Sequence, residues 1–79
     1  MDCHCVTSEN SEQYTRVASV SCKTPKGEIG IFKGHAEMFF LFDSGVLLTF
    51  EDETEKYLQT AHGYGHVVKD VVTLIYAQA

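Results

Sequence analysis

The side chains with the clearest chemical potential are the cysteines and histidines near the amino terminus. Cys3, His4 and Cys5 are consecutive and Cys22 follows later, and thiolates and imidazoles are the ligands of structural zinc. On a strand, Cys3 and Cys5 share a face about 6.6 Å apart, while His4 points the opposite way. Zinc sites favour about two to four intervening residues. We therefore predict no metal and no cofactor, and keep a small Cys/His metal or redox protein as an alternative.

Two further clusters contain metal-ligand residue types. His62 and His66 are four residues apart, a spacing that would bring them together on a helix, but Gly63 and Gly65 favour a turn or a strand. The acidic segment 51–56 lacks the ligand order and glycine of a calcium loop, so a solvated hairpin tip is expected. Neither cluster changes the prediction of no metal site.

Catalytic motifs are missing from the sequence. It contains no Gly-x-Ser-x-Gly elbow and no phosphate-binding loop, and no cysteine has an identifiable base and orienting partner. A chain of 79 residues also rarely builds both a core and an enclosed pocket. We predict a protein that is not an enzyme and has no small-molecule substrate.

Length and charge exclude several other classes. The 79 residues allow a single domain, 1–79, and the net charge of −5 has the wrong sign for a nucleic-acid binder. The longest apolar run, Met38–Phe42, is far shorter than the roughly 20 residues of a membrane-spanning helix. The amino terminus has neither the basic nor the apolar region of a secretory signal. Because the chain also has an odd number of cysteines, three, we expect free thiols in a reducing compartment.

Hydrophobic residues recur with a period of two, which predicts strands. The clearest is Val46–Phe50, and the three-residue step from Val17 to Val20 predicts a β-bulge in the strand around it. The expected strands are 2–7, 14–22, 28–32, 37–42, 46–50, 56–61, 64–68 and 71–76. About eight short strands predict an all-β fold, a small antiparallel β-sandwich or flattened barrel.

The strand at Met38–Phe42 carries large apolar groups on both faces. One interpretation is a central strand whose outer face is covered by loops. The other is that its outer face, carrying either Phe39 and Leu41 or Met38, Phe40 and Phe42, contacts another protein, because exposed apolar patches mark interfaces.

The segment Gly27–Ala36, which reads Gly-Glu-Ile-Gly-Ile-Phe-Lys-Gly-His-Ala, resembles a motif of the epsilon subunit of F-type ATP synthases. That motif is commonly Gly-Glu-hydrophobic-Gly-Ile-x-Pro-Gly-His-Ala, so Lys33 stands where the family has proline, whose fixed φ is lost. The resemblance continues in order along the chain, through segments 3–8, 17–20, 43–47, 57–58, 62–63 and 71–77. It also places Cys3, Cys5 and Cys22 where the family has core aliphatic residues.

The resemblance implies the amino-terminal β-sandwich of that subunit, a non-catalytic rotor element of the central stalk. Its implied role is to couple the gamma subunit to the membrane c-ring during ion-driven ATP synthesis. The implied location is peripheral, at the cytoplasmic face of a bacterial cell membrane. A generic β-sandwich interaction module with another partner is the alternative. The carboxy-terminal helices of longer members, which restrain ATP hydrolysis, are expected to be absent.

Site residues follow from the resemblance by position. The c-ring, whose loops offer a basic residue in this family, is expected to contact Glu28, which is placed in a turn. The neighbouring residues Ile29 and Gly30 are expected to take part in the same contact. Thr7, His35 and Phe40 are expected on the side that faces the gamma subunit. A solvated turn for Glu28 and a hydrogen bond of His35 to its own turn are the alternatives.

Overall fold

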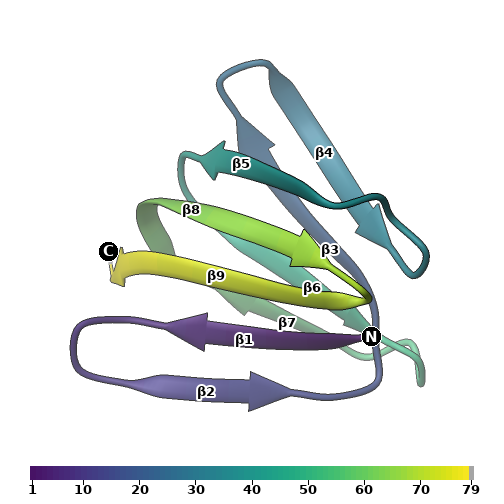
Figure 1. Ribbon diagram of the computed structural model, residues 1–79. Helices are drawn as coiled ribbons and strands as arrows, with labels where there is room; N and C mark the ends of the chain where they lie inside the picture. Colours follow the sequence, from purple (N-terminus) through teal and green to yellow (C-terminus); the bar gives the residue numbers. More distant parts are fainter. Residues whose placement is uncertain (79) are drawn as a thin grey trace.

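The computed structural model describes residues 1–78 and folds them into strands alone, in two sheets that pack face to face (Figure 1). Their bounds are β1 (Asp2–Val6), β2 (Ser11–Tyr14), β3 (Val17–Thr24), β4 (Gly27–Phe32), β5 (Met38–Phe42), β6 (Val46–Phe50), β7 (Glu55–Leu58), β8 (Thr60–Val68) and β9 (Val71–Gln78). The predicted β-sandwich is therefore confirmed, and within residues 1–78 no helix is long and apolar enough to cross a bilayer.

The strand order defines two layers. Sheet A has the order β2-β1-β9-β8-β5, and sheet B has the order β4-β3-β6-β7. All neighbours pair antiparallel except β1 and β9, which run parallel. Strands β4 and β5 lie at one edge of the sandwich, while β2 and β7 lie at the opposite edge (Figure 1).

Most predicted strands agree with the structure to within a few residues, and β6 agrees at both ends. The predicted bulge is confirmed, since the β3–β6 register shifts between Val17 and Ser19. Strand β2 was not expected, because Ser11–Tyr14 has no apolar alternation and its first three residues are exposed. The predicted break at 62–63 is wrong: β8 runs through it, and the chain breaks at Gln59 instead.

The core lies between the inner faces of the two sheets. Its buried hydrophobic residues are Cys3, Cys5, Val17, Val20, Cys22, Ile31, Phe40, Phe42, Val46, Leu48, Leu58, Val67, Val72 and Leu74. The expectation that the three cysteines occupy core positions is thus confirmed. Free buried cysteines pack as small hydrophobic groups, so they add to the apolar area that this short chain removes from water.

Two glycines of β8 make room for aromatic rings of β5. Phe40 pairs with Gly65 and Phe42 with Gly63 across the two strands. A Cβ atom at Gly65 would lie 2.3 Å from Cζ of Phe40, so the phenylalanine ring fills the space of the missing side chain. The sequence left a turn or a strand open for Gly63 and Gly65; both lie within β8, where they are sites of close packing.

The β8–β9 hairpin turns through Lys69 and Asp70, whose φ values of 48° and 62° are those of a two-residue type I′ turn. Asp70 also ties two other segments to this turn. Its Oδ1 atom accepts a 2.7 Å hydrogen bond from the Gly34 amide, and its carbonyl oxygen accepts one from the Asp2 amide. The turn therefore fixes the β4–β5 loop against the start of β1.

A buried hydroxyl joins the β5–β6 turn to the start of β8. Thr60 is 2% exposed, and its Oγ1 atom accepts a 3.0 Å hydrogen bond from the Gly45 amide. We expect Thr60→Val to lower the free energy of unfolding by about 1–3 kcal/mol, because the Gly45 amide loses its acceptor in a buried place. Urea denaturation measures this loss. Thr49→Val, on the half-buried face of β6, is the matched control, and equal losses in the two variants would contradict the assignment.

Candidate protein-interaction surfaces

An apolar row crosses the outer face of sheet A. Leu41 pairs with Tyr64 across β5 and β8, and Tyr64 pairs with Ile75 across β8 and β9. These three side chains are 64%, 50% and 37% exposed, and Val6 extends the row because it pairs with Ile75. Four neighbouring strands thus place apolar side chains on one outer face, and we call Val6, Leu41, Tyr64 and Ile75 the apolar row. Exposed apolar surface of this kind marks interfaces.

A second pair of side chains borders the apolar row. The Phe39 ring, which is 73% exposed, stacks on the His66 ring with 4.1 Å between the centroids and an interplanar angle of 6°. His66 Nε2 lies 3.0 Å from a carboxylate oxygen of Glu37. This contact fixes the imidazole and, through the stack, the orientation of Phe39, so a large apolar side chain is held in place without being buried.

Strand β5 also lines an apolar groove of about 470 Å³ at the edge of the sandwich. The lining residues come from the β3–β4 hairpin and from β5: Thr24, Pro25, Lys26, Ile29, Met38, Phe39, Phe40 and Leu41. Because β5 is an edge strand, the interpretation of Met38–Phe42 as a central strand is wrong. Its outer face, with Phe39 and Leu41, is open to solvent.

The three side chains expected to face the gamma subunit do not form one cluster. Thr7 follows β1, where its hydroxyl accepts a hydrogen bond from the Asn10 amide. His35 lies at the opposite end of sheet A, because the preceding Gly34 is bonded to Asp70, and its Nδ1 atom lies 2.7 Å from the Ala36 carbonyl oxygen. This is the hydrogen bond to its own turn that the alternative for His35 described.

The position of Phe40 corrects the expectation that its side chain is offered to a partner. The ring is only 8% exposed and belongs to the core. The outward side chains of the same strand are Phe39 and Leu41, and sequence reasoning left the choice of face open. Sequence reasoning did not single out Tyr64 and Ile75; the signal available was their place in the period-two alternation of β8 and β9.

The residues expected to contact the c-ring lie within β4 rather than in the turn before it. Glu28 and Gly30 are exposed on the outer face of sheet B, whereas Ile29 is half-buried and packs against the core. Glu28 is opposite Lys23 of β3, so an acidic and a basic residue are neighbours beside the β3–β4 hairpin turn. This surface and the apolar row belong to different sheets.

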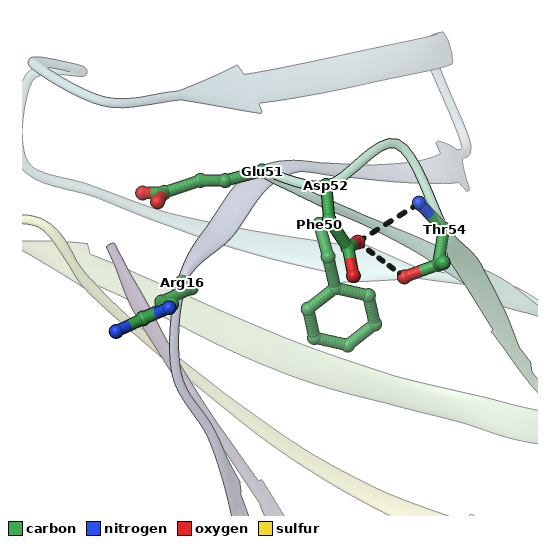
Figure 2. Close-up of a pocket in the computed structure, with 5 residues that line it drawn as sticks. All are labelled: Arg16, Phe50, Glu51, Asp52 and Thr54. Carbon is green, nitrogen blue, oxygen red and sulfur yellow. Dashed lines mark hydrogen bonds between the residues drawn. The ribbon is translucent and has the colours of Figure 1, made fainter.

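A polar concavity of about 500 Å³ lies beside the β6–β7 turn, lined by Arg16, Phe50, Glu51, Asp52 and Thr54 (Figure 2). One oxygen of Asp52 accepts hydrogen bonds from the amide and the hydroxyl of Thr54, and these bonds lower the pKa of Asp52. Figure 2 shows the Arg16 and Glu51 side chains extending away from this pair. The charged groups do not converge, and the acidic segment forms a hairpin tip as expected.

Metal-ligating side chains do not gather in threes within residues 1–78. His62 and His66 lie on the same face of β8 with Tyr64 between them, about 13 Å apart at the rise of a strand. His4 lies on the half-buried outer face of β1, whereas Cys3 and Cys5 point inward.

Comparison with known proteins relates this geometry to a family. The family model of the ATP synthase delta/epsilon chain, beta-sandwich domain, matches residues 1–79. None of the curated protein sequences compared with the chain matches it.

Two solved structures share the fold. One is the Euglena gracilis mitochondrial ATP synthase, OSCP/F1/c-ring, in rotational state 1, with a TM-score of 0.84 and 18% identity over 96% of this chain and 49% of that chain. The other is the Tetrahymena thermophila mitochondrial ATP synthase, central stalk/c-ring, with a TM-score of 0.84 and 9% identity over 99% of this chain and 63% of that chain. This chain therefore spans less than two thirds of either relative, and at these identities the likeness shows the fold alone. The match of the family model along residues 1–79 shows the family as well as the fold. The chain belongs to the delta/epsilon chain family of ATP synthases, and the matched region is the beta-sandwich domain of that family.

Proposed function

We propose that the chain is a non-catalytic subunit of the central stalk of an F-type ATP synthase. Its proposed role is to couple the gamma subunit to the c-ring during ion-driven ATP synthesis. The observation that carries the proposal is the apolar row, in which Leu41, Tyr64 and Ile75 remain 37–64% exposed in adjacent strands. A chain of this family with such a surface has the means to bind a protein partner along a whole sheet.

We assign the outer face of sheet A to the gamma subunit. Phe39 and Leu41 replace Phe40 as the contacts from β5, because they are 73% and 64% exposed while Phe40 is 8% exposed. Thr7 and His35 remain proposed contacts at opposite ends of this face. A gamma subunit that touches both would lie along the strands of sheet A and cover the apolar row between them.

We assign the outer surface of β4 to the c-ring. Glu28 and Gly30 are exposed there, with Ile29 half-buried between them. An exposed carboxylate paired with a basic loop contributes about 0.2–1 kcal/mol, so Glu28 serves orientation more than affinity. With the gamma-facing surface on sheet A and the ring-facing surface on sheet B, the sandwich itself would be the rigid connection between the two partners.

The proposed location follows from the proposed complex. A stalk subunit is held at a membrane by its partners, without a spanning segment of its own. The resemblance implied the cytoplasmic face of a bacterial membrane, whereas the two related structures are from mitochondrial enzymes. These structures do not support a bacterial origin. The proposed location is therefore peripheral attachment to a membrane through the complex.

The test is binding to the gamma subunit of the source organism's own ATP synthase. Leu41→Asp places a charge in the apolar row, and we expect its dissociation constant for gamma to rise at least about 30-fold, since a central interface residue contributes about 2 kcal/mol or more. Tyr57→Asp, at a side chain that is also 64% exposed but lies on β7 of sheet B, should bind like the unchanged chain. Titration calorimetry with both folded variants measures the difference.

Two outcomes would contradict the proposal. If the unchanged chain and folded gamma form no complex, the stalk function is wrong. If Leu41→Asp binds as tightly as Tyr57→Asp, the stalk function stands but the assigned surface is wrong.

A further inference from the structure

The outer face of sheet A holds a carboxylate and an imidazole in contact beside the apolar row. Nε2 of His66 lies 3.0 Å from a carboxylate oxygen of Glu37, and the two side chains are 30% and 61% exposed. A carboxylate only accepts hydrogen bonds, so Nε2 carries the hydrogen, and Nδ1 is the nitrogen that gains or loses a proton. With a neutral imidazole the pair has one net negative charge, and with a protonated imidazole it has none.

A partner that binds Phe39 must also cover this pair. Phe39 and His66 are directly opposite each other in the β5–β8 pair, and their ring centroids are 4.1 Å apart in a stack. Side chains stand roughly perpendicular to a sheet, so the two stacked rings stand side by side and face the same partner. A gamma subunit that contacts Phe39 therefore displaces water from His66 and from the Glu37 carboxylate bonded to it.

The charge next to His66 comes from Glu37, while the strand on its other side contributes an uncharged residue. His66 is opposite Thr73 of β9, and Thr73 is in turn opposite His4 of β1. The other charged or titratable side chains of β8, its following turn and the β4–β5 loop are His62, Tyr64, Lys69, Asp70, Lys33 and His35. Because Glu37 is the group that His66 contacts, it sets the charge to which the imidazole responds.

Loss of water favours the protonated form of the pair. A carboxylate beside a neutral imidazole is an isolated charge, which is costly at a buried interface, whereas a carboxylate and an imidazolium together are neutral. The imidazolium would also stack on the face of the Phe39 ring, to which a cation is attracted. Both effects are stronger where water is excluded, so the pair holds its proton to a higher pH in a complex than in the free chain.

We propose that Glu37 and His66 form a proton-binding pair that links association of the gamma subunit to the uptake of one proton. This inference rests on the proposed function, because gamma is the partner assigned to this face. The proton comes from solvent, binds Nδ1 of His66 and returns to solvent when the complex dissociates. Binding is therefore stronger at low pH, and the gain is lost as the pH rises through the range in which the bound pair releases its proton.

The test is titration calorimetry of gamma binding in buffers of different ionisation enthalpy, which counts the protons taken up. At about pH 7.5, where histidine is mostly neutral, we expect the unchanged chain to take up about one proton per complex. The dissociation constant should rise about tenfold for each unit of pH between about pH 7 and pH 8, which is the dependence that one linked proton produces.

Three variants assign the proton. Glu37→Gln keeps an oxygen acceptor for the Nε2 hydrogen but removes the charge, so it should abolish both the proton uptake and the pH dependence. His66→Gln should also take up no proton, and it should bind gamma more weakly than Glu37→Gln because its carboxylate stays unpaired. His62→Gln is the matched control, at an exposed histidine on the same face of β8, and should take up the same proton as the unchanged chain.

The outcomes separate this inference from the stalk function. Binding without proton uptake, uptake that persists in Glu37→Gln, or uptake that is lost in His62→Gln overturns the proton linkage and leaves the stalk function standing. The absence of any complex between the unchanged chain and folded gamma overturns both. A merely positioning role of Glu37 would survive in Glu37→Gln, because the amide oxygen still accepts the hydrogen bond.

Discussion

A Phe40→Asp variant is expected to be unfolded at room temperature. Phe40 is 8% exposed, its ring fills the space above Gly65, and its centroid is 6.2 Å from that of Phe42. Removing a buried phenylalanine costs about 3–5 kcal/mol, and burying a carboxylate in its place adds a further penalty. These costs together approach the whole stability of a small domain, about 5–15 kcal/mol. Far-ultraviolet circular dichroism and urea denaturation measure the result.

Phe39→Asp is the control at the neighbouring position. Phe39 is 73% exposed, so its loss removes mainly the stack on His66, for which about 0.5–1.5 kcal/mol is typical. The variant should therefore remain folded. Equal stability of the two variants would show that β5 presents the opposite face, and the assignment of Phe39 and Leu41 to a partner would then fail as well.

Gly63→Ala is expected to destabilise the fold by about 3 kcal/mol, at the upper end of the cost of overpacking a core. The added Cβ atom would lie 2.4 Å from the carbonyl oxygen of Ile75 and 2.8 Å from Cζ of Phe42. The first neighbour is backbone of the paired strand β9, which cannot move away without breaking the β8–β9 register. Denaturant midpoints of the folded variant measure the loss.

Gly30→Ala is the matched control for this substitution. Gly30 is also a strand glycine, but it is exposed on β4, and its added Cβ would lie 3.2 Å from the Phe32 ring. The Phe32 side chain is 61% exposed and free to turn, so a change within about 1 kcal/mol is expected. Similar losses at Gly30 and Gly63 would mean that close packing does not explain the glycine in β8.

The features that could be predicted from the sequence are those that depend on the residues of a single strand. The alternation in Val46–Phe50 gave both ends of β6, and the irregular step after Val17 located the bulge in β3. Strand β2 could not be predicted in this way, because it is held by its pairing with β1 and carries no apolar face of its own. Its existence depends on a neighbour in the sheet and not on its composition.

The candidate surfaces were less predictable, because they depend on register between strands. Leu41, Tyr64 and Ile75 are widely separated in the sequence, and only the pairing of β5, β8 and β9 aligns them. The inward direction of Phe40 follows from the glycine opposite it, and a strand with large apolar residues on both sides does not reveal this locally.

The parallel pairing of β1 with β9 has a consequence for synthesis on the ribosome. Sheet B joins strands β3, β4, β6 and β7, which have all been translated by residue 58. In sheet A, β9 lies between β1 and β8, so β1 has no central neighbour until residues 71–78 have emerged. Until then the first strand of a nascent chain lacks this neighbour, and its two core cysteines remain uncovered. Contacts of such long sequence separation form slowly.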